Sequence, residues 1–261
     1  MNKIRYPAVA GAFYPADPVQ LQNRIDQYLN DARPGGKVPK AIIAPHAGYI
    51  YSGPIAATAY AWLIQGKDRI RRVVLVGPSH RVGFRGLAVS TADTFATPLG
   101  NIPIDTASIK QITELPYVQY LDQAHELEHS LEVHLPFLQD TLDHFTLVPV
   151  VAGDAPAEQV SQVLELLWGG PETLIVISSD LSHYHDYYTA QQLDRATSDK
   201  IEKLQFEKLD FDSACGRVPV SGLLALARKK SLHVTTVDLR NSGDTAGDKD
   251  RVVGYGAYII D

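Results

Sequence analysis

Short, continuous apolar runs constrain the fold of this chain more than any other feature of its sequence. Each run is rich in β-branched residues and is bounded by turn-forming residues. A strand with one face in water would alternate apolar and polar side chains, so continuous apolarity predicts strands buried on both faces of a sheet. The predicted strands span residues 41–44, 73–76, 145–151, 174–177 and 252–260.

Stretches with helical periodicity lie between these runs. The first begins with Asp17-Pro18, an N-cap residue followed by proline in the first turn. Strand and helix patterns alternate along most of the 261 residues, which favours a single α/β domain with a largely parallel or mixed sheet. The predicted helices span residues 17–29, 55–63, 157–167, 190–204 and 221–229.

Charge and composition argue against several classes of partner. The net charge of −6 disfavours nucleic acid, because phosphate backbones need clustered Lys and Arg. No apolar run approaches the roughly 20 residues that span a bilayer, and residues 1–7 contain no apolar signal-peptide region. The one cysteine, Cys215, allows no intrachain disulfide, which fits a reducing compartment. We therefore expect a cytoplasmic protein with no membrane partner.

Histidines follow three of the predicted strands in matching positions. His46 follows the run at 41–44, His80 follows the run at 73–76, and His183 follows the run at 174–177. In α/β sheets, ligands bind outside the carboxyl ends of the strands, where the connecting loops converge. Neutral imidazoles together with a carboxylate are typical of non-haem iron and catalytic zinc sites. The acidic, glycine-rich loop 241–250 could supply that carboxylate, although such a composition is also typical of a plain surface turn.

A further polar cluster occupies residues 125–136. If it were one helix, His125 and His129 would lie one turn apart on the same face, with His129 and Glu132 also adjacent. Such a face could supply ligands or a proton relay, and the alternative is a polar helix start that packs against the site.

Six sequence strings together resemble the Memo family, in the same order and nearly from end to end. The resemblance implies a fold similar to the catalytic subunit of class III extradiol dioxygenases, an α/β/α sandwich in enzymes that use non-haem iron. It also implies Ammecr-like and radical-SAM proteins as partners. The strings are PAVAGAFYP at 7–15, PHAGY at 45–49, GPSH at 77–80, EHSLEVHLP at 128–136, SSDLSH at 178–183 and CGRVP at 215–219.

The resemblance also implies a ligand set of two histidines and a third residue, which is glutamate in the dioxygenases and cysteine in animal Memo. His46 and His80 match the two histidine positions. Counted back from Gly254, the third position falls in the acidic loop, and Cys215 is assigned to a different motif. We expect Asp244 as the third ligand, because threonine is a poor ligand for a divalent transition metal. The alternatives in this loop are Thr245 and Asp248.

The favoured function is an Fe(II)-dependent oxidoreductase that acts on a small, planar or aromatic molecule, with Zn(II) or copper as alternative metals. In this hypothesis His183 is the acid/base and Asp180 or Glu132 orients its ring, while His129 contacts substrate or a ligand. The residues expected to line the substrate pocket are Tyr49, Tyr51 and Tyr184.

Two other functions fit the same residues. The pocket could bind a peptide without turnover, because animal Memo is described as a signalling adaptor. Alternatively, the same ligands could hold Zn(II) with a bound hydroxide for hydrolysis. Oxygen-dependent turnover and metal content distinguish these hypotheses.

Overall fold

A computed structural model describes residues 3–261 of the chain. Met1 and Asn2, part of the segment in which we expect no signal peptide, lie outside the described residues. The centre of the molecule is a nine-stranded mixed sheet with the strand order β10-β12-β2-β9-β3-β8-β4-β7, in which β11 pairs with the other edge of β12. A separate small sheet has the order β1-β5-β6. The predicted α/β/α sandwich with a mixed sheet is confirmed.

The four central strands run parallel, and antiparallel strands flank them on both sides. β2, β9, β3 and β8 are parallel neighbours, whereas β12 and β4 pair with them in the antiparallel sense. All four residues of β2 and all six of β9 are buried, as their continuous apolar sequences predict. The strands are β1 (Ile4–Arg5), β2 (Ala41–Ala44), β3 (Arg72–Pro78), β4 (Leu87–Val89), β5 (Thr94–Thr97), β6 (Gly100–Pro103), β7 (Val118–Tyr120), β8 (Thr146–Ala152), β9 (Thr173–Ser178), β10 (His183–His185), β11 (Val234–Asn241) and β12 (Val252–Ile260).

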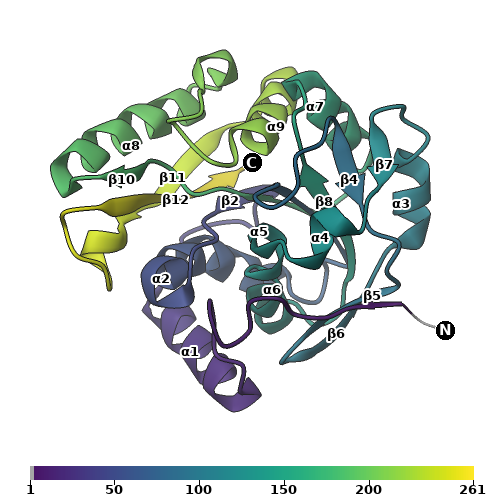
Figure 1. Cartoon of the computed structure of the whole chain (residues 1–261), viewed down its shortest axis with the longest axis horizontal. Coiled ribbons are helices and arrows are strands. Elements are labelled where there is room, and N and C mark those ends of the chain that lie inside the picture. Colours follow the sequence, from purple (N-terminus) through teal and green to yellow (C-terminus); the bar gives the residue numbers. More distant parts are fainter. Residues whose placement is uncertain (1–2) are drawn as a thin grey trace.

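Helices cover both faces of the central sheet. Figure 1 shows α1, α2 and α6 on one side of it and α7, α8 and α9 on the other. Short 3₁₀ turns occupy Ala61–Gly66, Phe206–Lys208 and Ser242–Asp244. The helices are α1 (Pro18–Asp31), α2 (Tyr49–Tyr60), α3 (Thr106–Ile112), α4 (Gln123–Glu126), α5 (His129–Glu132), α6 (Leu135–Thr141), α7 (Ala157–Leu166), α8 (Tyr187–Glu202) and α9 (Arg217–Lys229). No helix among residues 3–261 is long and apolar enough to cross a membrane.

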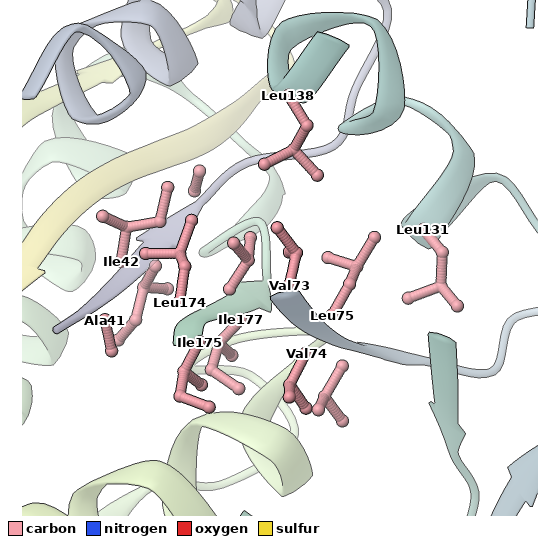
Figure 2. Close-up of a cluster of buried hydrophobic side chains, with 14 of the residues drawn as sticks. Ala41, Ile42, Val73, Val74, Leu75, Leu131, Leu138, Leu174, Ile175 and Ile177 are labelled. Atoms are coloured by element: carbon pink, nitrogen blue, oxygen red, sulfur yellow. The ribbon is translucent and has the colours of Figure 1, made fainter. Parts of the chain in front are cut away.

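The apolar core lies on both faces of the parallel strands. Figure 2 shows Leu131 of α5 and Leu138 of α6 on one side of β3, while Val74 and Ile175 point toward the other side. This two-sided burial follows from the pleat, because successive side chains of a strand point to opposite faces. β2, β3 and β9, the strands that precede the loops of the candidate site, are thus almost completely buried.

Three predicted helices begin earlier than expected, and a fourth predicted helix is not formed as one element. The helices expected from residues 55, 190 and 221 begin at Tyr49, Tyr187 and Arg217. The helix expected at residues 55–63 begins earlier, at Tyr49, whose backbone N–H donates to the Phe13 carbonyl, and it continues through Pro54. The single helix considered for residues 125–136 is wrong, because the segment folds as α4, α5 and α6. Glu128 adopts an extended conformation and its side chain caps α5 by accepting from the Ser130 N–H, which breaks the helical register.

Candidate metal centre

The candidate site lies at the edge of the sheet where three parallel strands end. β2, β9 and β3 are adjacent and parallel, so the loops that leave their carboxyl ends emerge at the same edge. His46, Asp180 and His80 lie on these three loops. The expected position for a ligand site in an α/β sheet therefore brings together residues that are far apart in sequence.

His46 and His80 meet at this edge, and the third potential ligand beside them is Cys215. One ligand-capable atom from each of these three residues lies within 4.8 Å of the other two. His46 Nε2 is 3.3 Å from Cys215 Sγ, and the two imidazole rings meet edge to face with centroids 5.1 Å apart. Cys215 enters the site from the turn that precedes α9. Burial, and then the nearby Asp180 carboxyl group, raise the pKa of the Cys215 thiol above its ordinary value.

The structure places Asp244, the expected third ligand, outside the group formed by His46, His80 and Cys215. The Asp244 carboxylate accepts hydrogen bonds from the Asn241 N–H and the Tyr187 hydroxyl, and it closes a capping box on the 3₁₀ turn. Neither alternative fits better, because Thr245 Oγ1 donates to the Tyr51 carbonyl while Asp248 accepts from backbone N–H groups of its own loop. Among the described residues, the groups of His, Cys, Asp and Glu side chains arranged to hold a metal include neither Asp244 nor Asp248.

The family resemblance contained a signal that could have identified the cysteine. Animal Memo uses cysteine as the third ligand, and Cys215 is the only cysteine of this chain. Matching the third position by its distance from the last strand directed the assignment to the acidic loop instead. The pattern of strand ends does not predict a role for Cys215, because this residue lies in the turn before α9 and not after a strand.

Glu128 holds both His80 and the neighbouring His129. His80 Nδ1 lies 2.8 Å from Glu128 Oε1, and the His80 backbone N–H donates to Oε2 at 2.6 Å. His129 Nδ1 lies 3.4 Å from the same carboxylate, and its ring stacks on His80 with centroids 4.6 Å apart. Burial alone would raise the pKa of Glu128, but the hydrogen bonds from His80 and Ser130 lower it to about 2. Glu128 is therefore ionised at neutral pH and orients the His80 ring, although the sequence did not single it out.

Asp180, His183 and Cys215 form a second group whose ligand-capable atoms lie within 4.8 Å of one another. Asp180 Oδ1 accepts from the His46 N–H at 2.8 Å. Burial raises the pKa of Asp180 to about 7, and burial lowers the pKa of His183. Asp180 and His183 thus lie close together beside Cys215, and Asp180 can exchange a proton near neutral pH.

Glu132 was expected near His183, but the structure places it in a separate buried network. Its carboxylate accepts from the Arg5 guanidinium, the Ala8 and Val9 N–H groups and the Tyr14 hydroxyl. All of these contacts lie in the N-terminal segment, so Glu132 anchors that segment to α5. The hydrogen bonds of Glu132 therefore support a structural role and include no contact with His183 among the described residues.

The three tyrosines predicted for the pocket divide into two groups. Tyr49 is buried in the core, and its hydroxyl donates to the Val133 carbonyl. Tyr184 is exposed, and its ring meets His183 edge to face with centroids 5.8 Å apart. Tyr51 is also exposed, and its backbone carbonyl accepts a hydrogen bond from the Thr245 hydroxyl of the acidic loop.

Two buried residues that the sequence did not single out lie behind His46. Ser178, the last residue of β9, has its hydroxyl oxygen 2.6 Å from His46 Nδ1 and 2.9 Å from His134 Nε2. His134 Nδ1 lies 2.8 Å from the Tyr60 hydroxyl, and burial lowers the pKa of His134 to about 3. His134 is therefore neutral and belongs to the support of the site.

Comparison with known proteins agrees with this fold. A family model described as Memo-like protein matches residues 5–259. An uncharacterized protein from Escherichia coli K12 has a similar structure, with a TM-score of 0.51 at 15% identity over 84% of this chain and 98% of that chain. This structural likeness concerns the fold alone.

Sequence relatives match over nearly the whole length. A MEMO1 family protein from Aquifex aeolicus is 38% identical, and the match covers 99% of this chain and 99% of that protein. A MEMO1 family protein from Metallosphaera sedula is 34% identical, with 96% of this chain and 97% of that protein covered. The chain belongs to the Memo family.

Proposed function

We propose that this protein holds a transition-metal ion through His46, His80 and Cys215 and uses it for oxidoreductase chemistry on a small molecule. The observation that carries the proposal is the convergence of one nitrogen or sulfur atom from each residue within 4.8 Å. Two imidazoles and one thiolate suit iron, copper and zinc, and they leave coordination positions for other molecules. Fe(II) remains the favoured metal, because it supplies redox chemistry with oxygen.

The surroundings of the three residues support this assignment. The Glu128 carboxylate faces His80 Nδ1, as carboxylates commonly face the outer nitrogen of metal-binding histidines. Burial disfavours the Cys215 thiolate in the metal-free protein, whereas a bound cation would favour it, so metal binding should release a proton. The His80 side chain is 28% exposed, which leaves this side of the site open to solvent.

Three further groups would serve a bound substrate. Asp180 can accept or donate a proton near neutral pH because burial raises its pKa to about 7. His183 has a lowered pKa and is a neutral base at that pH. His129 stacks on His80 and its Nδ1 faces the Glu128 carboxylate, so its other ring nitrogen would be the atom that contacts a ligand.

Metal-dependent hydrolysis is the second candidate, and the Asp180 carboxyl group favours it. A carboxylate that titrates near pH 7 beside a zinc site is suited to act as a general base toward water. This function predicts activity that needs zinc and does not need oxygen.

The metal content of anaerobically prepared protein, reconstituted with Fe(II), tests the ligand assignment. We expect about one equivalent of iron in the wild type and a loss of iron in His46→Ala, His80→Ala and Cys215→Ser. Asp244→Asn is the matched control, because it alters the carboxylate that the sequence favoured and leaves the three proposed ligands intact. Retention of iron in this variant is the expected result.

Three outcomes would contradict the proposal in part or in whole. If Asp244→Asn loses the metal while Cys215→Ser keeps it, the third ligand lies in the acidic loop. If the wild type takes up neither iron, zinc nor copper, the metal site fails and a binding function without turnover is favoured. Uptake of zinc alone, with activity that ignores oxygen, would replace the oxidoreductase by the hydrolase.

A further inference from the structure

A chain of four buried polar groups leads from the core to His46. The chain consists of Tyr60, His134, Ser178 and His46, and each of these residues is at most 1% exposed. Tyr60 belongs to α2, whereas His134 lies between α5 and α6 and Ser178 ends β9. Buried polar groups need hydrogen-bond partners, so the direction of each bond can be worked out from the donors and acceptors present.

The Ser178 hydroxyl determines the direction of the bonds around it. This hydroxyl has one hydrogen and two lone pairs. It donates to the Ser130 carbonyl oxygen at 2.6 Å, which can only accept. Its two remaining contacts, with His46 Nδ1 and His134 Nε2, must therefore be bonds in which the imidazoles donate. Both rings carry a hydrogen on the nitrogen that faces Ser178.

The outer part of the chain is consistent with this arrangement. His134 is neutral, since burial lowers its pKa to about 3, so a hydrogen on Nε2 leaves Nδ1 as an acceptor. The Tyr60 hydroxyl lies 2.8 Å from Nδ1 and supplies the donor. Burial also raises the pKa of Tyr60, so its hydroxyl keeps the proton that it donates. Every polar side-chain atom of His134 and Ser178 thus has a partner of the correct kind.

We infer that Ser178 and His134 are positioning residues, which hold His46 as the Nδ1–H tautomer with its Nε2 lone pair directed at the metal site. This inference rests on the proposed metal-binding function and adds the residues that prepare one ligand for it. A hydrogen on Nδ1 leaves neutral His46 with a free lone pair on Nε2, the atom that lies 3.3 Å from Cys215 Sγ. Glu128 orients His80 in the same way, because its carboxylate faces His80 Nδ1. The Ser178 hydroxyl thus orients His46, and the Glu128 carboxylate orients His80.

The tautomers can be measured directly in metal-free protein by long-range ¹H–¹⁵N correlation spectra of the histidine rings. We expect the hydrogen of His46 on Nδ1 and that of His134 on Nε2. Assignment uses the spectra of His46→Gln and His134→Gln. The opposite tautomer at His46 overturns the inference, and this measurement decides the question even if the wild type binds no metal.

Metal affinity supplies the second measurement. We expect Ser178→Ala to raise the Kd for Fe(II) about 10- to 100-fold, the usual effect of losing a residue that orients a ligand. Ser178→Thr keeps the hydroxyl and should recover most of the affinity. His125→Gln is the matched control, because His125 is an equally buried histidine that bonds to the Ala88 carbonyl and contacts none of the three proposed ligands.

The outcomes separate positioning from general stability. Circular dichroism and thermal unfolding first establish that each variant is folded. A folded Ser178→Ala variant with the wild-type Kd overturns the inference. An equal loss of affinity in His125→Gln also overturns it, because the effect would then follow from a disturbed core. A wild type that binds no metal but shows the expected tautomers refutes the proposed function and leaves the hydrogen-bond assignment intact.

Discussion

Replacement of Glu132 by glutamine should reduce stability strongly without removing the metal site. The carboxylate is completely buried and accepts from the Arg5 guanidinium, the Ala8 N–H at 2.8 Å, the Val9 N–H at 3.0 Å and the Tyr14 hydroxyl at 2.6 Å. The Arg5 side chain is only 6% exposed, so water cannot replace the lost partner. The variant keeps the shape of the side chain and removes its charge.

The expected size of the effect follows from the unpaired cation. Removal of one partner of a buried ion pair costs about 3–5 kcal/mol, because the remaining charge stays buried without compensation. Tyr14→Phe removes one hydrogen bond to the same carboxylate and should cost about 1.5–3 kcal/mol. The double variant Arg5→Met/Glu132→Leu removes both charges and should be more stable than Glu132→Gln. Equilibrium unfolding in urea, followed by circular dichroism, measures all three free energies.

The same variants test whether Glu132 belongs to the catalytic site. Glu132→Gln should retain the bound metal at temperatures where it is folded. A free energy of unfolding within about 1 kcal/mol of the wild type would refute the reasoning about the buried cation. Loss of metal from a fully folded Glu132→Gln variant would instead return this residue to the site.

Two further predictions concern pH and are measured on metal-free protein as differences from a variant. Burial raises the pKa of Asp180 to about 7, so the folded state keeps a proton that the unfolded chain releases near pH 4. The free energy of unfolding should therefore fall as the pH rises from about 4 to 7, by at most roughly 1.4 kcal/mol per pH unit. This fall should be absent in Asp180→Asn. The opposite slope over this pH range would contradict it. Burial lowers the pKa of His125 to about 4, so its contribution to stability is lost as the pH falls from 6.5 to about 4, up to roughly 3 kcal/mol. Unfolding free energies of His125→Gln should show a shallower acid loss than the wild type, and an unchanged slope would refute the prediction.

The fold could be predicted from local sequence because its signals are local. Continuous apolar runs such as that of β9 indicate a strand buried on both faces, and the structure buries every residue of β9. The same runs place His46 and His80 at strand ends, where the parallel pairing of β2, β9 and β3 brings these ends to one edge. Local patterns did not predict the break at Glu128, because an N-cap competes with helix continuation through a side-chain contact that spacing does not reveal.

The third proposed ligand could not be identified from local sequence patterns, because its position depends on contacts between segments that are distant in sequence. Cys215 lies 169 residues from His46 in sequence, yet the packing of α9 against the sheet brings its sulfur within 3.3 Å of His46 Nε2. The Asp244 carboxylate has ligand chemistry that suits iron, but the structure does not group it with His46 and His80. Residue type alone cannot decide which of two candidates lies beside the two histidines.

The sequence by itself determined the family, the α/β architecture and the strand ends that carry His46 and His80, because motifs and apolar periodicity are properties of short segments. Only the tertiary structure decided that Cys215 completes the cluster and that Ser178 and His134 support it. These roles follow from side-chain distances and from the match of donors to acceptors in a buried space, and both exist only after distant segments have packed together.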